Sequence, residues 1–108
     1  MSTTIDCAHA NYSSCSTMGP EDVGLDSPAG DGKWGQSDLA GNVGEWMLDS
    51  YAQYVTPCTD CANVEPPLGS RVIRSGSYGI VGSALISSYR SMGPIRDGSV
   101  GVRCVRAP

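Results

Sequence analysis

The sequence predicts an irregular α+β domain, or a mainly β one, that is rich in loops and built on short antiparallel strands. Fourteen glycines and seven prolines among 108 residues indicate many turns. The chain has no phenylalanine, so we expect a thin core. Short stretches alternate between apolar and polar residues, most clearly at residues 100–106, as strands with one buried face do. This length suits one small domain with a modest stability margin.

The elements can be justified in chain order. Residues 1–27 are polar and lack a sustained apolar period, so we expect a partly ordered segment before a main unit at residues 28–108. Residues 28–35 read as a loop, with Trp34 as its anchor in the core. We predict three strands, at residues 72–78, 84–89 and 100–106, the last of which shows clear alternation.

The stretch at residues 42–54 is ambiguous on its pattern alone. Its apolar residues fit one face of a helix about as well as any other arrangement. Gly41 and Gly44 argue against a helix start, because each glycine costs roughly 1 kcal/mol there.

Charge excludes some functions. The net charge is −4 with only seven basic residues, which argues against nucleic-acid binding, since that needs a basic surface. No apolar stretch approaches the ~20 residues that span a bilayer, so we expect no membrane association. No signal-peptide core follows Met1.

Five cysteines are many for a cytosolic domain of this size, which slightly favours a disulfide-permissive compartment, secreted or periplasmic. At most two disulfides can form. The spacing of Cys58 and Cys61 predicts a local staple, with a redox or metal-binding pair as alternatives. Zinc would need a second pair of ligands, and His9 is the one histidine in the sequence.

The most informative stretch is D-L-A-G-N-V-G-E-W at residues 38–46. It combines two carboxylates with a turn that can direct carbonyl oxygens, which are the ligands a hard cation such as Ca²⁺ prefers. R-V-I-R-S-G-S-Y follows at residues 71–78, and G-V-R-C at residues 101–104. In this order and spacing the three motifs resemble the C-terminal half of the formylglycine-generating enzyme family, the sulfatase-modifying factors. That family reads D-L-x-G-N-V-W-E-W, R-V-x-R-G-G-S-W and G-F-R-C.

The resemblance implies a truncated C-type-lectin-like fold over residues 28–108, with residues 43–47 as a strand rather than a helix. The family's full domain is more than twice as long, so part of its usual core surface must be absent, rebuilt or supplied by another chain. Cys104 falls where the family often has a structural cysteine, and we expect it to pair with Cys7 or Cys15.

The resemblance also implies a structural calcium site. Its ligands would be the Asp38 and Glu45 carboxylates and the Gly41 and Val43 carbonyls. Residues two apart in extended backbone point the same way, which suits Gly41, Val43 and Glu45. The alternative is a local turn at Asp38 with a solvated Glu45. Gly44 departs from the family, which has tryptophan there.

Catalysis is where the sequence departs furthest from the family. The family oxidises a substrate cysteine with O₂, using two cysteines that hold copper(I). Their positions fall near Gly82 and Ser87, and no cysteine lies between Cys61 and Cys104. We therefore predict no catalytic residues and a lost oxidase activity. The alternative is a fragment of a copper- or iron-dependent sulfatase-modifying oxidase whose catalytic groups lie outside this chain.

Two features bear on partners. The arginines, Arg90 and Arg103 among them, are expected to clamp loops through carbonyls and a carboxylate such as Asp49 or Asp97, with anion binding as the alternative. The loops from Gly79 to Ser99 carry apolar residues that could bind an unknown protein or small molecule, pack in the core, or join two copies as a homodimer. The sequence thus favours a catalytically inactive binding or interaction module with structural Ca²⁺.

Overall fold

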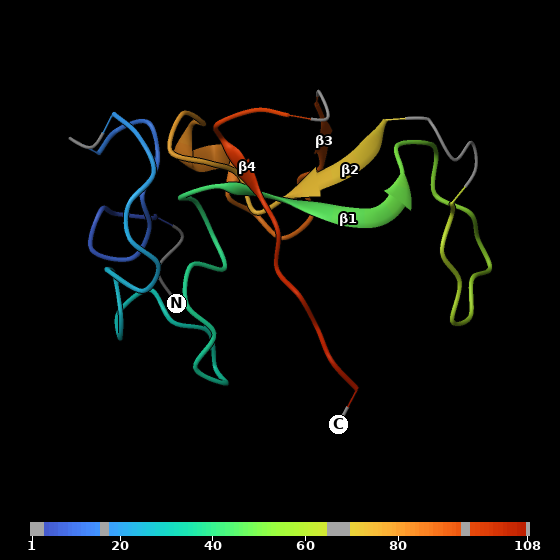
Figure 1. Ribbon diagram of the computed structural model, residues 1–108, viewed down its shortest axis with the longest axis horizontal. Coiled ribbons are helices and arrows are strands. Elements are labelled where there is room, and N and C mark those ends of the chain that lie inside the picture. The colour runs from blue at the N-terminus through green and yellow to red at the C-terminus, as the bar shows by residue number, and fades with distance from the viewer. Residues whose placement is uncertain (1–3, 16–17, 65–69, 94–95, 108) are drawn as a thin grey trace.

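The computed structural model describes residues 4–15, 18–64, 70–93 and 96–107. Its centre is a small curled sheet with the strand order β3-β2-β1-β4 (Figure 1). The strands are β1 (Gly44–Ser50), β2 (Arg71–Arg74), β3 (Ser91–Met92) and β4 (Val100–Gly101). A single 3-10 turn, η1 (Gly82–Ala84), is the helical element of the described residues, so the α component of the predicted fold class is not confirmed.

The sheet mixes two strand directions. β1 pairs with β2, and β2 with β3, in the antiparallel sense. β1 pairs with β4 in the parallel sense, through Gly44 opposite Val100 and Glu45 opposite Gly101. The expectation of antiparallel strands was therefore wrong at this edge. The stretch at residues 42–54 forms a strand, which Gly44 enters by donating its N–H to the Ser99 carbonyl at 2.7 Å.

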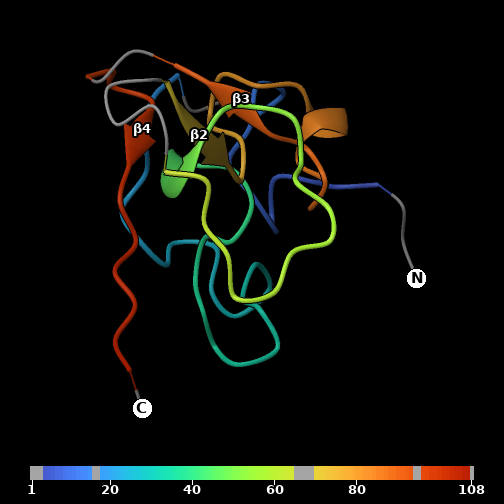
Figure 2. The same ribbon diagram turned by 90° about the vertical axis from the view of Figure 1, so that its right-hand side faces the viewer.

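Two of the predicted strands are shorter than expected. β2 ends at Arg74 because Ser75 and Gly76 adopt left-handed conformations, with φ of 72° and 68°. After Gly101 the chain is extended but makes no ladder, and the C-terminal tail leaves the sheet as a separate segment (Figure 2).

The strand predicted at residues 84–89 was wrong. Backbone N–H groups there make local hydrogen bonds: Leu85 donates to the Gly82 carbonyl and Tyr89 to the Ile86 carbonyl. The Ser87 and Tyr89 carbonyls accept hydrogen bonds from Arg74 instead of from a neighbouring strand. This stretch therefore forms local turns and not a paired strand.

The core is thin, as expected. Its buried apolar residues are Ala10, Val72, Ile73 and Ala84. Trp34 is 78% exposed, with Lys33 over its ring, so its prediction as a core anchor was wrong. Residues 28–35 instead hold themselves by short-range bonds, among them Gly35 N–H to the Gly32 carbonyl at 2.9 Å.

Two disulfides staple loops on either side of the sheet. Cys58 pairs with Cys61, which confirms the predicted local staple. Cys7 pairs with Cys15 and Cys104 is a free, exposed thiol, so the predicted pairing of Cys104 was wrong. The two N-terminal cysteines are only eight residues apart in sequence, and Cys104 lies in the C-terminal tail, which makes no ladder after Gly101.

Gly44 lies where the family carries a large ring, and the space is already filled. A Cβ added there would approach the Cγ2 methyl of Ile73 to 2.7 Å, across the β1–β2 pair. We predict that Gly44→Trp lowers the free energy of unfolding by about 1–3 kcal/mol, because this branched methyl cannot move aside cheaply. Chemical denaturation would measure it. Gly79→Trp is the matched control, since nothing lies within 4 Å of its Cβ position, and a smaller loss in Gly44→Trp than in the control would contradict the packing.

The cysteine pairing predicts one reactive thiol per chain in the unreduced, denatured protein. Thiol titration should give one equivalent in the native sequence and none in Cys104→Ser. Cys58→Ser is the control and should raise the count to two by releasing Cys61. No thiol in the native sequence would show that Cys104 is paired after all.

Candidate metal site

The turn that precedes β1 is built from left-handed residues. Asp38, Gly41 and Asn42 have φ of 55°, 78° and 61°. Asparagine and aspartate tolerate this conformation better than other residues with a Cβ. Gly41 has a further reason to be glycine, because a Cβ would collide with the Asn11 carbonyl. The local sequence therefore permits a tight turn pressed against the N-terminal segment.

Asn42 ties this turn to two other parts of the chain. Its Oδ1 accepts the Glu21 N–H at 2.8 Å, and its Nδ2 donates to the Glu21 carbonyl at 3.1 Å. Its backbone N–H donates to the Asn11 carbonyl and its carbonyl accepts the Tyr78 N–H, both at 2.8 Å. Asn42 thus acts as a scaffold residue.

The structure brings the four predicted metal-binding residues together. Asp38, Gly41, Val43 and Glu45 line one cleft of about 130 Å³ at the foot of β1. The remaining lining residues are Val23, Asn42, Val102 and Arg103. Residues from the N-terminal segment and the C-terminal tail therefore enclose the motif, which the sequence pattern alone did not indicate.

Both carboxylates have defined partners. Asp38 Oδ2 accepts the Gly24 N–H at 2.8 Å, a bond that spans 14 residues and is not a local turn. Glu45 Oε1 accepts Arg103 Nε at 2.8 Å, and the Glu45 side chain is only 13% exposed. The alternative of a local turn with a solvated glutamate therefore does not describe this site. Each carboxylate keeps a second oxygen that accepts no hydrogen bond from the described residues.

Arg103 closes the cleft from the C-terminal side. Besides Glu45, it donates from Nη2 to the carbonyls of Ser37 and Asp38 at 2.9 and 3.1 Å. The hydrogen bond that Arg103 donates to Glu45 raises the pKa of Arg103, and partial burial opposes that rise. This guanidinium clamps a loop, as expected, and its positive charge is one that a bound cation would have to tolerate.

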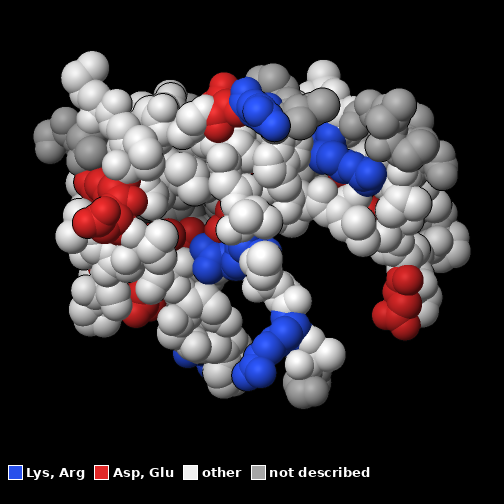
Figure 3. All heavy atoms as spheres, viewed as in Figure 1, with Lys and Arg blue, Asp and Glu red and all other residues white. Residues whose placement is uncertain are grey.

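Negative charge gathers around the turn. Burial raises the pKa of Asp26, and the neighbouring charges of Glu21 and Asp38 raise it further. Acidic side chains are also visible over the N-terminal part of the molecule at the left of Figure 3. Acidic groups therefore lie near the turn, and Arg103 is the basic group that lines the cleft itself.

Asn11 is a buried structural residue that was not identified from the sequence. Its side chain is 2% exposed, its Nδ2 donates to the Gly19 carbonyl at 3.0 Å, and its Oδ1 is buried without a partner among the described residues. The only signal in the sequence was an Ala-Asn pair in a polar stretch.

The positions expected for the family's catalytic cysteines lie away from this cleft. Gly82 belongs to η1 and packs against Ile5 and Tyr12, while Ser87 is exposed and offers its carbonyl to Arg74. Among the described residues no three His, Cys, Asp or Glu side chains gather as a metal-binding cluster. The candidate site depends instead on two carboxylates and two carbonyls. No helix of the described residues is long and apolar enough to cross a membrane.

The structure is similar to that of Treponema denticola variable protein 1, with a TM-score of 0.69 and 27% identity. The match covers 88% of this chain but only 34% of that one, so the chain spans about a third of the length of its structural neighbour. No curated protein matched the chain.

The strongest comparison is with a protein family. Residues 8–108 match the family described as the sulfatase-modifying factor enzyme 1-like domain. The match confirms the resemblance carried by the motifs at residues 38–46, 71–78 and 101–104, and it extends into the N-terminal segment. The chain therefore belongs to the sulfatase-modifying factor enzyme 1-like domain family.

Proposed function

We propose that this chain is a binding or interaction module of the family, without oxidase activity, that holds one structural Ca²⁺ at the turn from Asp38 to Glu45. The observation that carries the proposal is the shared cleft of Asp38, Gly41, Val43 and Glu45. Ca²⁺ takes six to eight oxygen ligands, so water would complete the set that these residues begin.

The chain's own residues fit a hard cation in three ways. The free oxygens of Asp38 and Glu45 are of the right chemical type, and Asp26 and Glu21 add negative charge nearby. The Gly24 N–H and Arg103 hold the other carboxylate oxygens, which reduces the entropy lost on binding. A cation would in turn link the turn before β1 to the tail after β4.

The absence of oxidase activity rests on the sequence. The chain has no cysteine between Cys61 and Cys104, and soft thiolates are the ligands that copper(I) requires. The second candidate, a fragment of a copper- or iron-dependent oxidase, is favoured by the coverage of only a third of the structural neighbour. In that case the catalytic groups would lie outside these residues.

The binding role draws support from the loops between Gly79 and Ser99. Val81, Ile86 and Met92 each expose more than half of their surface. Pro94 and Ile95, which were part of the predicted apolar set, lie outside the described residues. Apolar side chains exposed on an acidic domain suit contact with a ligand or with a second copy in a homodimer. Sedimentation analysis would distinguish monomer from dimer.

The two disulfides are compatible with an oxidising compartment. Secretion or export to the periplasm is part of the proposal.

The calcium proposal predicts about one calcium per purified chain by elemental analysis. Removing it with EGTA should lower the melting temperature by roughly 10–20 °C, because a ligand at 100 times its Kd stabilises by about 2.7 kcal/mol and each kcal/mol shifts the melting of a domain of this size by about 4–8 °C. Asp38→Asn should lose most of this calcium-dependent shift. Asp22→Asn is the matched control, since this exposed carboxylate does not line the cleft.

The readout is the calcium-dependent shift and not stability itself, since Asp38 also accepts the Gly24 N–H. A chain without calcium whose melting is unchanged by EGTA would remove the metal claim. Copper or iron near one per chain would favour the oxidase fragment.

A further inference from the structure

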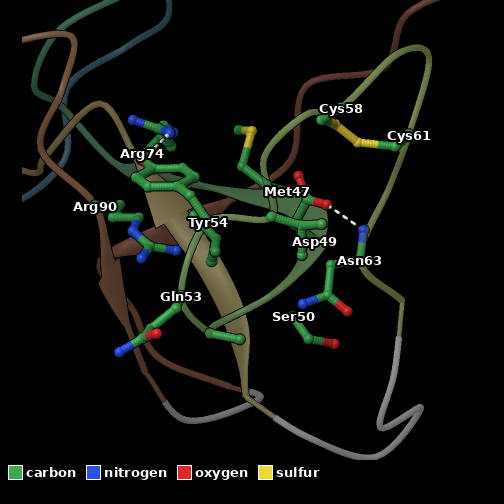
Figure 4. Close-up of a pocket in the computed structure, with 13 residues that line it drawn as sticks. Met47, Asp49, Ser50, Gln53, Tyr54, Cys58, Cys61, Asn63, Arg74 and Arg90 are labelled. Carbon is green, nitrogen blue, oxygen red and sulfur yellow. Dashed lines mark hydrogen bonds between the residues drawn. A yellow bond between two sulfur atoms is a disulfide. The ribbon is translucent and has the colours of Figure 1, made fainter.

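A second cleft, of about 180 Å³, opens at the other end of β1 (Figure 4). Its walls come from the second half of β1, from the loop at residues 51–63, and from Arg90 before β3. Met47, Val55 and Val72 give it an apolar side, and the Cys58–Cys61 disulfide lies at its rim. The loop is closed at its base by Ser50 N–H to the Asn63 carbonyl and Asn63 N–H to Asp49 Oδ1, both at 2.6 Å.

Tyr54 lies between two arginines in this cleft (Figure 4). Arg74 Nη2 donates to the Tyr54 hydroxyl at 3.0 Å, and Arg74 Nη1 donates to the carbonyls of Ser87 and Tyr89 at 2.9 and 3.3 Å. Arg74 is therefore a structural residue whose donors are committed. Its role is to fix the position of the Tyr54 ring.

Arg90 is positioned differently. Its guanidinium lies over the Tyr54 ring, 4.1 Å from the ring centre, and over the Tyr51 ring at 4.8 Å. Within residues 4–15, 18–64, 70–93 and 96–107, no oxygen accepts a hydrogen bond from it. The expected clamp to carbonyls and to Asp49 or Asp97 is not what holds this arginine. Stacking on aromatic faces holds the plane of the guanidinium, and none of the five N–H groups along its edge donates to an oxygen of the described residues.

The Arg90 guanidinium has no hydrogen-bond acceptor among the described residues and lies beside an apolar wall. This combination favours one class of ligand. The fork of donors on the guanidinium matches a carboxylate in a bidentate manner. Asp49 lines the same cleft and would repel a second negative charge, which disfavours phosphate. The cleft is smaller than the 300–1,000 Å³ usual for drug-sized ligands, so the apolar body must be small.

We propose that this cleft binds a monocarboxylate carried on a small apolar group, with Arg90 pairing the carboxylate and Met47, Val55 and Val72 contacting the apolar body. This proposal names a chemical class of ligand for the binding role proposed above, and it rests on that role. The two fail separately, because the calcium site lies at the opposite end of β1 and is tested by metal content and melting.

Sodium benzoate, titrated into the unreduced full chain and followed by amide NMR shifts, tests the proposal. We expect a Kd on the order of 1 mM, typical of so small a ligand, with shifts centred on Tyr54 and Val55. Benzamide, which has nearly the same shape but no charge, should bind at least about tenfold more weakly, and inorganic phosphate likewise, since neither offers a single charged carboxylate. Acetylated dipeptides ending in leucine, with a free or amidated carboxyl terminus, show whether a peptide terminus is preferred to a free acid.

Arg90→Gln should weaken benzoate binding at least about tenfold, and Arg90→Lys should give an intermediate loss, because lysine keeps the charge without the planar fork. Arg96→Gln is the matched control: it removes the same charge from an exposed position that does not line the cleft. The lysine variant keeps the test valid if the glutamine variant does not fold.

Three outcomes would overturn the proposal. The first is no saturable shift with benzoate. The second is equal binding of benzoate and benzamide. The third is loss of binding in Arg96→Gln as large as in the folded Arg90 variants, which would mean that net charge and not this cleft attracts the ligand.

Discussion

The Asn42 side chain is buried within a left-handed turn, and both ends of its amide bond the backbone of Glu21. Through its own backbone it also joins the N-terminal segment to the turn after β2. A thin apolar core cannot by itself fix three irregular segments, because little surface is removed from water. Directional bonds from one buried amide do so instead, and an unpaired amide at this depth would cost roughly 1–3 kcal/mol for each polar group. The positions of Asp38, Gly41 and Glu45 follow from this contact.

The two candidate sites use arginine in different ways. Arg103 and Arg74 donate hydrogen bonds to carbonyls and to one carboxylate, and so act as cross-links between loops. Arg90 donates no hydrogen bond within the described residues and is held by aromatic rings instead. A chain with few regular hydrogen-bonded ladders needs such cross-links, since its loop carbonyls would otherwise lack partners. Arg90, which departs from this use, is the arginine to which the proposed ligand would bind.

Much of the architecture could be predicted from the sequence, and the failures have physical causes. The family resemblance of the motif at residues 38–46 predicted the strand that follows the turn and the grouping of Asp38 with Glu45, whereas the residue pattern alone left residues 42–54 ambiguous. Pairing partners were less accessible. Nothing in the sequence of residues 84–89 reveals that Arg74 donates to the Ser87 and Tyr89 carbonyls, which a neighbouring strand would otherwise use. Nor does the sequence show that Cys7 and Cys15 meet across a short turn, or that the Trp34 ring faces solvent.

The cleft with Asp38 and Glu45 lies at the first residues of β1, and the cleft with Arg90 lies at its last residues. Seven residues of strand separate their ends by roughly 20 Å, well beyond the ~8 Å over which exposed charges interact at physiological ionic strength. The register of β1 against β2 also breaks between Trp46 and Ser50, so a strain applied at one end is not carried along an unbroken ladder. The two proposed sites can therefore diversify separately, because substitutions at the Arg90 end do not reach the proposed calcium-binding turn or the N-terminal segment that bonds to it.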